Sequence, residues 1–346
     1  MKFSLGYQLP DEFDSVTEIA EDFHKNISEI YFAWPGEPSG RTPVGFMEPD
    51  LDECKAIMEK ELSRVKQLGI NLVLLLNSNC YGKDAVSFVL QNRMIALVGE
   101  LDSKLGLDTV TTTSPFVAQT VKENFPHLSV RASVNMRIGT IKGMECVSEY
   151  FDGFYMQREY NRDFERIKLL HTWCEENNKT LHMLANSGCL NFCSNQTFHD
   201  NMVAHEAQIY LNRNVERKYP SPCWNYIEKR ENWVSFLQNS WVRPEDISHY
   251  APYFSTIKLA TRMHANPRKI ISAYSRERFT GNLLDLTEPG YSQLFKDYIL
   301  DNRLFPVNWF DTTSKCNKQC NTCNYCSEVL TKILVNVNEL EAQFVQ

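Results

Sequence analysis

Hydrophobic residues along the chain fall into short apolar runs that alternate with longer segments of helical spacing. The run NLVLLL at 71–76 is the clearest apolar segment, and most of the others are bounded by turn residues and rich in β-branched or aromatic side chains. These features are typical of buried strands. The predicted strands are 3–8, 29–34, 71–76, 108–112, 128–134, 152–156, 180–185 and 255–260.

The segments between these runs have the three- and four-residue spacing of amphipathic helices. In 50–67 the apolar positions Leu51, Cys54, Met58, Leu62 and Val65 recur at three- and four-residue spacing, and Gly69 is a natural stop. The predicted helices are 15–26, 50–67, 84–104, 115–124, 140–149, 162–177, 267–278 and one near 327–343.

The alternation of strands and helices predicts an α/β fold with a parallel sheet. Eight strands match the count of a (β/α)8 TIM-like barrel, although a doubly wound open sheet fits the same alternation. About seventy residues separate the seventh strand from the eighth, too many for a simple connection. We therefore predict a barrel domain over 1–285 that includes an insertion at 186–254. A Cys-rich C-terminal extension that ends in an amphipathic helix would follow at 286–346.

Composition narrows the class of protein. The 346 residues are 43% hydrophobic and 23% charged, which excludes a disordered or low-complexity chain. A formal net charge of −7 does not favour binding to the phosphate backbone of a large nucleic acid. Because no apolar run is long enough to cross a bilayer and the first residues lack a signal-peptide core, we expect a soluble, cytoplasmic protein.

Seven of the eleven cysteines form two groups in the C-terminal half. Cys189 and Cys193 directly follow the seventh predicted strand, and Cys223 joins them from the insertion. The second group is Cys316, Cys320, Cys323 and Cys326, four thiols within eleven residues. In a reducing compartment such clusters indicate metal or iron–sulfur ligation rather than disulfides. The second group suits either an iron–sulfur cluster or a tetrahedral zinc ion.

Polar residues at the predicted strand ends are candidates for catalysis. Arg137, Arg158 and Arg262 could clasp an anionic substrate with paired hydrogen bonds, or they could serve only in surface ion pairs. His199 lies close to the first cysteines, and its ordinary pKa near neutrality suits proton transfer. A structural histidine bonded to the backbone is the alternative.

The region around the first cysteines resembles the collagenase-like peptidase family U32. The resemblance lies in Leu184–Cys193, Phe198–Asn201, Trp241–Asp246 and Gly281–Asp285. It implies a barrel-like domain with an oxygen-sensitive 4Fe–4S cluster and an oxygen-independent hydroxylation of tRNA, rRNA or ubiquinone precursors. Peptidase is the older label of a few members. Those relatives place four cluster cysteines in the middle of the chain, whereas this sequence has three there and four more in the tail.

The main hypothesis is an iron–sulfur oxidoreductase or hydroxylase with one or two 4Fe–4S clusters. All seven grouped cysteines would be cofactor ligands, with zinc at the C-terminal quartet as an alternative. The candidate partners are an anionic small molecule, a nucleic-acid or peptide substrate, an electron-donor protein, and further subunits in a homo- or hetero-oligomer. A peptidase and an accessory metal-binding subunit are the competing hypotheses. No Gly-x-Ser-x-Gly elbow or His-Glu-x-x-His helix supports proteolysis.

Overall fold

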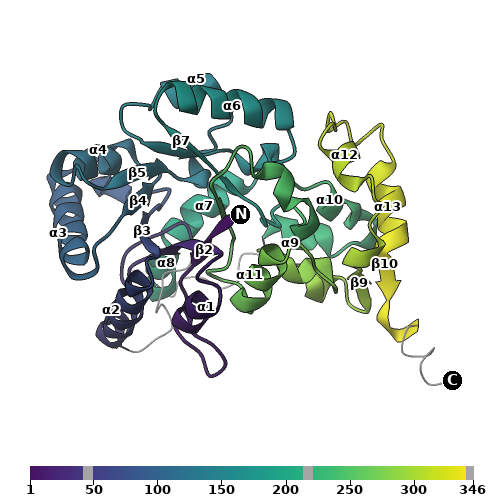
Figure 1. The fold of residues 1–346 in the computed structure, drawn as a ribbon, viewed down its shortest axis with the longest axis horizontal. Helices are drawn as coiled ribbons and strands as arrows, with labels where there is room; N and C mark the ends of the chain where they lie inside the picture. The colour runs from purple at the N-terminus through teal and green to yellow at the C-terminus, as the bar shows by residue number, and fades with distance from the viewer. Residues whose placement is uncertain (42–49, 213–220, 340–346) are drawn as a thin grey trace.

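Eight parallel strands form a closed barrel in the computed structural model, which describes residues 1–41, 50–212 and 221–339 (Figure 1). Each strand pairs with the next, and β8 pairs with β1. The strands are β1 (Lys2–Gly6), β2 (Ile27–Phe32), β3 (Asn71–Leu76), β4 (Thr109–Thr112), β5 (Ser129–Ala132), β6 (Gly153–Tyr155), β7 (Thr180–Leu184) and β8 (Thr256–Lys258). The predicted (β/α)8 barrel is confirmed, and the open-sheet alternative is wrong because β1 and β8 leave no free edge.

Helices connect the strands and cover the outside of the barrel. They are α1 (Val16–Asp22), α2 (Leu51–Gln67), α3 (Phe88–Leu105), α4 (Pro115–Asn124), α5 (Ile141–Glu145), α6 (Phe164–Glu176) and, after β8, α11 (Pro267–Ser275). Helix α2 shows that the spacing of apolar residues correctly predicted the buried face of a helix. The Asp50 side chain accepts hydrogen bonds from two backbone N–H groups of the first turn, and Met58 and Leu62 are fully buried on the helix face predicted to be apolar.

Alternate residues of the strands face two different cores. Ile30 and Phe32 of β2 belong to the large core between strands and helices, whereas Tyr31 belongs to a small separate cluster inside the barrel. The barrel interior is also strongly polar. The Glu29 carboxylate lies 2.7 Å from the Arg131 guanidinium, and the Lys258 ammonium lies 3.7 Å from the centroid of the Tyr31 ring.

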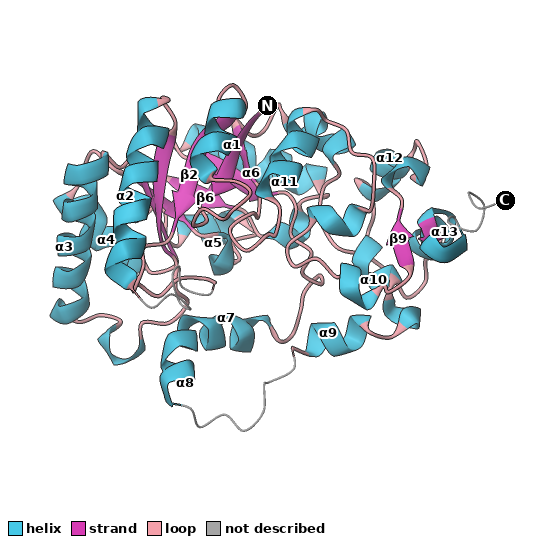
Figure 2. Cartoon of the chain, turned by 90° about the horizontal axis from the view of Figure 1, so that it is seen from below, coloured by secondary structure: helices cyan, strands magenta, loops and turns pink. Residues whose placement is uncertain are grey.

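The insertion between β7 and β8 is built mainly of short helices. They are α7 (Gln196–Ala204), α8 (Glu206–Asn212), α9 (Pro222–Ile227), α10 (Val234–Leu237) and the 3-10 helix η5 (Pro244–Tyr250). Figure 2 shows α7 below the end of the barrel that lies opposite the N-terminus. Because β1 starts at the N-terminus and all strands are parallel, this is the C-terminal end of the strands, where barrel enzymes place their active sites.

The C-terminal segment packs against the insertion. It contains β9 (Tyr298–Leu300), α12 (Trp309–Thr313), α13 (Tyr325–Ile333) and β10 (Leu334–Asn336), and the Trp309 ring stacks on Trp241 at a centroid distance of 5.9 Å. The predicted helix near 327–343 is partly wrong. It ends at Ile333 because the next three residues pair antiparallel with β9, and residues 340–343 lie outside the described part of the chain. The domain division at residue 285 stays a prediction.

Within the described ranges, none of the helices combines the length and the apolar character that a bilayer crossing requires.

Candidate active site

The loop after β7 is held firmly against residues 286–289. The buried Asn186 side chain donates to the carbonyl groups of Ala260 and Leu286 and accepts a hydrogen bond from the Ala260 N–H. Gly188 then donates its N–H to the Glu288 carbonyl at 2.9 Å. A Cβ atom at residue 188 would lie 2.1 Å from the Pro289 carbonyl oxygen, so only glycine permits this approach. These contacts fix the point from which Cys189 enters the site.

Three cysteines from two separate segments line one pocket at this end of the barrel. Cys189 and Cys193 belong to the loop after β7, and Cys223 is the second residue of α9. All three are partly buried. Burial raises the pKa of the Cys223 thiol, and its electrostatic interaction with Cys189 and Cys193 raises this pKa further. These three residues are called the pocket cysteines below.

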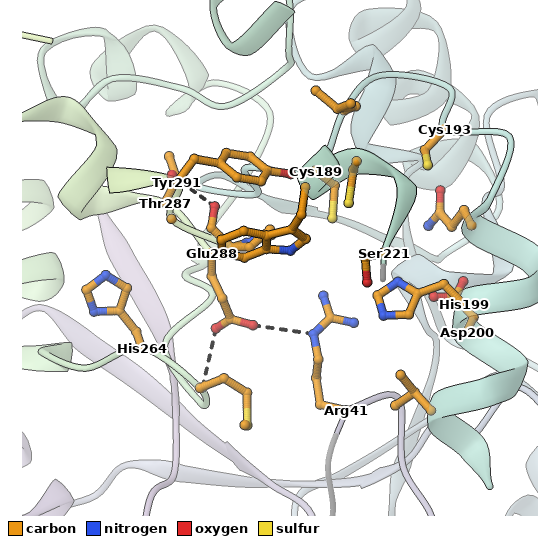
Figure 3. Close-up of a pocket in the computed structure, with 18 of the residues that line it drawn as sticks. Arg41, Cys189, Cys193, His199, Asp200, Ser221, His264, Thr287, Glu288 and Tyr291 are labelled. Carbon is orange, nitrogen blue, oxygen red and sulfur yellow. Dashed lines mark hydrogen bonds and ion pairs between the residues drawn. The ribbon is translucent and has the colours of Figure 1, made fainter. Parts of the chain in front are cut away.

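Tyr291 lines the pocket beside the pocket cysteines. Its phenol is buried next to Cys223, and Figure 3 shows its ring beside Cys189. Burial is the main reason why the pKa of Tyr291 is raised, with further contributions from Cys189 and Cys223. The phenol therefore stays protonated and can donate a hydrogen bond to sulfur.

The pocket has a volume of about 1090 Å³ and is lined by several basic side chains. Arg41, from the loop after β2, pairs with Glu288 at 3.3 Å, and Figure 3 shows it reaching towards the space between Glu288 and His199. Burial lowers the pKa of the Arg41 guanidinium, but the nearby anionic groups of Glu288, Cys189 and Asp200 raise it above its ordinary value. Arg41 thus keeps its positive charge beside the thiols.

Two further basic residues line the pocket. Arg158 is only 6% exposed, and its ion pair with Glu159 is long at 3.8 Å. Lys269 pairs with Asp285 at 3.2 Å. Because the ion pair of Arg158 with Glu159 is weak, the Arg158 guanidinium is able to bind an additional anion.

His199 lies on α7 and faces the same pocket (Figure 3). Burial lowers its pKa, and the positive charge of Arg41 lowers it further. The imidazole is therefore neutral at pH 7 and able to accept a proton. The neighbouring Asp200 pairs with Arg137 at 3.2 Å, which links α7 to the segment after β5.

Comparisons with known proteins agree with this architecture. An uncharacterized protease of Methanocaldococcus jannaschii is 24% identical over 333 residues, which cover 94% of each chain. The solved structure of a U32 peptidase superposes with a TM-score of 0.51 at 14% identity, covering 75% of this chain and 92% of that one. The chain is thus similar in sequence to the archaeal protein, and it shares the fold of the solved peptidase. No protein-family model matches the sequence.

The four predicted catalytic residues occupy different places. His199 and Arg158 line the pocket, as described above. Arg137 does not line it and contacts it only through Asp200. Arg262 is also outside the lining. It donates to the Ser39 hydroxyl, and burial lowers its pKa to about 10. Arg137 and Arg262 thus lie just outside the lining, next to pocket residues, and the catalytic roles of all four residues stay predictions.

Sequence reasoning missed Arg41, Glu288 and Tyr291, which are central to the pocket. Arg41 lies in the loop after β2. Because barrel enzymes build their active sites from the loops after the strands, its position could have identified it as a candidate. Glu288 and Tyr291 flank the turn-forming Pro289 and Gly290, in a stretch assigned to the C-terminal extension. Nothing in its local pattern indicates that it returns to the loop after β7.

The four C-terminal cysteines, called the tail cysteines below, lie apart from the pocket. They are Cys316, Cys320, Cys323 and Cys326, and none of them lines it. Cys320 and Cys326 interact electrostatically with the other members of the group. Burial raises the pKa of the Cys326 thiol to about 11, although Arg162 opposes this rise. The structure thus separates the seven grouped cysteines into two sets.

In the part of the chain that the structure describes, no three His, Cys, Asp or Glu side chains are arranged to hold a single metal ion. A single ion requires its ligands to meet at one point. In an iron–sulfur cluster, by contrast, each thiolate binds a different iron atom, so the sulfurs surround a larger group. An iron–sulfur cluster on the pocket cysteines therefore stays a prediction.

Proposed function

We propose that this protein is an iron–sulfur oxidoreductase that acts on an anionic substrate at the barrel mouth. The observation that carries the proposal is the meeting of three thiols, from the loop after β7 and from α9, on one wall of the pocket. Thiolates are the usual ligands of iron–sulfur clusters, and a pocket beside basic residues suits a substrate with carboxylate or phosphate groups.

The pocket cysteines would hold a 4Fe–4S cluster through three of its four irons. Such a cluster supplies electron transfer or, at an iron without a protein thiolate, Lewis acidity. Among the described residues, no fourth cysteine lines the pocket. One iron of such a cluster would then have no protein thiolate and would supply the Lewis acidity. Tyr291 would donate a hydrogen bond to sulfur, which tunes the potential of a cluster.

The chain's own residues have distinct roles in this proposal. Arg41 and Arg158 bind the anionic group of the substrate and orient it towards the cysteine wall. Glu288 holds Arg41 in place through the 3.3 Å ion pair. His199, neutral at pH 7, accepts or returns a proton at the substrate atom that faces α7. Hydroxylation is one reaction of this class, and the substrate itself is left open between small molecules and nucleotides.

Iron and acid-labile sulfide in anaerobically purified protein provide the test. We expect the single variants Cys189→Ser and Cys223→Ser to lose the iron assigned to the pocket, because each removes one of only three thiolates. Cys146→Ser is the matched control, since Cys146 is an exposed thiol outside both groups. Electron paramagnetic resonance of the dithionite-reduced proteins should show the corresponding loss of one signal. Unchanged iron, sulfide and spectra in both variants would contradict the proposal.

Peptidase activity is the second candidate, because the two relatives are named as a protease and a peptidase. Cys189 and the neutral His199 share the pocket, as a thiol nucleophile and its base would.

We expect no hydrolysis of an unstructured peptide such as reduced, alkylated casein fragments, with or without iron. The measurement is the release of new amino termini over time. Hydrolysis that is lost in Cys189→Ala yet persists after anaerobic removal of iron would establish the peptidase and overturn the oxidoreductase.

A further inference from the structure

The tail cysteines lie in a compact segment between α12 and the first turn of α13. Cys316, Cys320 and Cys323 are exposed, and Cys326 is partly buried at the start of α13. The backbone N–H of Lys318 donates to the Cys316 sulfur at 3.3 Å. A backbone N–H that points at a cysteine sulfur is one of the groups that stabilise a thiolate in an iron–sulfur site.

Two cations lie beside this segment. The Arg162 guanidinium stacks 4.5 Å from the Trp241 ring centroid, donates to the carbonyl groups of Leu237 and Trp241, and interacts electrostatically with Cys326, Cys316 and Asp246. The Lys318 ammonium donates to the Glu159 carbonyl and interacts electrostatically with Asp163 and Cys316. Because both cations act on tail cysteines, they would favour a group of negative charge there.

The spacing of the tail cysteines favours a cluster over a zinc ion. Structural zinc sites with four cysteine ligands pair two short Cys-x2-4-Cys units across a longer spacer, commonly of about 15 residues. Here all four thiols fall within eleven residues, with only two or three residues between neighbours. Runs of this kind are typical of iron–sulfur proteins.

We propose that the tail cysteines hold a second 4Fe–4S cluster, separate from the pocket, which takes up single electrons at the protein surface. The reaction is a one-electron transfer in which the oxidised cluster gains one electron and a low-potential one-electron carrier loses one. The exposed positions of Cys316, Cys320 and Cys323 place this cluster where such a carrier can approach. Arg162 and Lys318 offset its negative charge, which makes reduction easier.

The tail segment also contacts the loop that carries two of the pocket cysteines. The Lys318 ammonium lies 5.1 Å from the Tyr160 ring centroid and 5.5 Å from that of Phe192. Phe192 lies between Cys189 and Cys193, and its ring packs edge-on against Tyr160 at 5.9 Å. The tail site is therefore adjacent in structure to the pocket loop, although it is distant in sequence.

The test compares three full-length proteins purified without oxygen. One lacks the pocket thiols (Cys189→Ser, Cys193→Ser and Cys223→Ser), one lacks two tail thiols (Cys320→Ser and Cys323→Ser), and Cys146→Ser is the control. We expect about eight irons per chain in the control and about four in each of the other two. After reduction with dithionite, the pocket variant should keep a cluster signal in electron paramagnetic resonance. Adding Arg162→Met to the pocket variant should shift its midpoint potential to a more negative value.

Each outcome bears on one site alone. About four irons and four sulfides in the pocket variant would support the tail cluster. A colourless tail variant would refute only the pocket cluster, because that variant keeps the pocket cysteines. One zinc ion and no sulfide in the pocket variant would overturn the inference, and so would a protein that binds neither. Should the tail variant fail to fold, the pocket variant by itself decides the question.

Discussion

Asn186→Ala is expected to lower the free energy of unfolding by about 3–5 kcal/mol. The Asn186 side chain is fully buried, and its Nδ2 donates to the carbonyls of Ala260 and Leu286 at 3.0 and 2.9 Å. Its Oδ1 accepts the N–H of Ala260 at 2.5 Å. Alanine would leave three buried backbone groups without partners, and each such group costs about 1–3 kcal/mol. Urea unfolding followed by circular dichroism measures the change.

Asn177→Ala is the matched control for this prediction. Asn177 is exposed at the end of α6, and its side chain donates only to the carbonyl of Trp173. We expect a change of less than about 1 kcal/mol, because water replaces the lost partner. A second readout is the rate at which a thiol reagent modifies Cys189, which should rise in Asn186→Ala as the loop loosens. Equal stabilities of Asn186→Ala and the wild type would show that these hydrogen bonds do not hold the site together.

Lys258→Met is expected to stabilise the protein, and the gain should depend on pH. Lys258 is enclosed by the barrel, where burial lowers its pKa from 10.5 to about 7, and the positive charge of Arg262 contributes to this fall. Between these two pH values the unfolded chain binds more protons than the folded one. The stability of the wild type therefore rises with pH in this range, by up to about 1.4 kcal/mol per pH unit.

The variant lacks this titration, so the stability difference between the two proteins should shrink as pH rises. We expect Lys258→Met to be more stable at pH 7 by about 4 kcal/mol and about half of this advantage to vanish by pH 9. Urea unfolding of both proteins at pH 7, 8 and 9 measures it. Lys142→Met, an exposed lysine on α5, should follow the wild type throughout. A pH-independent difference would show that Lys258 keeps its ordinary pKa.

The strand order of this protein could be predicted because each strand is a short apolar run between polar segments. All eight predicted strands overlap the observed ones, and 71–76 agrees at both ends. Local patterns carry this information because burial in a barrel demands apolar side chains at every outward-facing position of a strand. The last helix was predicted to be too long because only local patterns were used. Leu334–Asn336 fits a helical pattern, yet its pairing with β9 is a contact that no local pattern contains.

The cysteine groups were also readable from spacing, whereas the complete pocket was not. Cys189 and Cys193 were found because thiols cluster after a predicted strand. Arg41 and Glu288 were missed because they are separated by 247 residues and form an ion pair only once the chain has closed. The ion pair between Arg137 and Asp200 also joins residues that are distant in sequence. Arg137, which was predicted to bind substrate, therefore pairs with a side chain of the protein.

The amino-acid sequence by itself determined the barrel, the insertion after the seventh strand and the two groups of thiols, because hydrophobic periodicity and residue spacing are local properties. Only the tertiary structure decided that Arg41, Glu288 and Tyr291 line one pocket with the first group of thiols, while the tail cysteines gather elsewhere beside Arg162. The reason is that the return of residues 286–291 to the loop after β7 depends on the buried hydrogen bonds of Asn186 and on the close approach at Gly188. Both are long-range contacts, and they exist only in the folded chain.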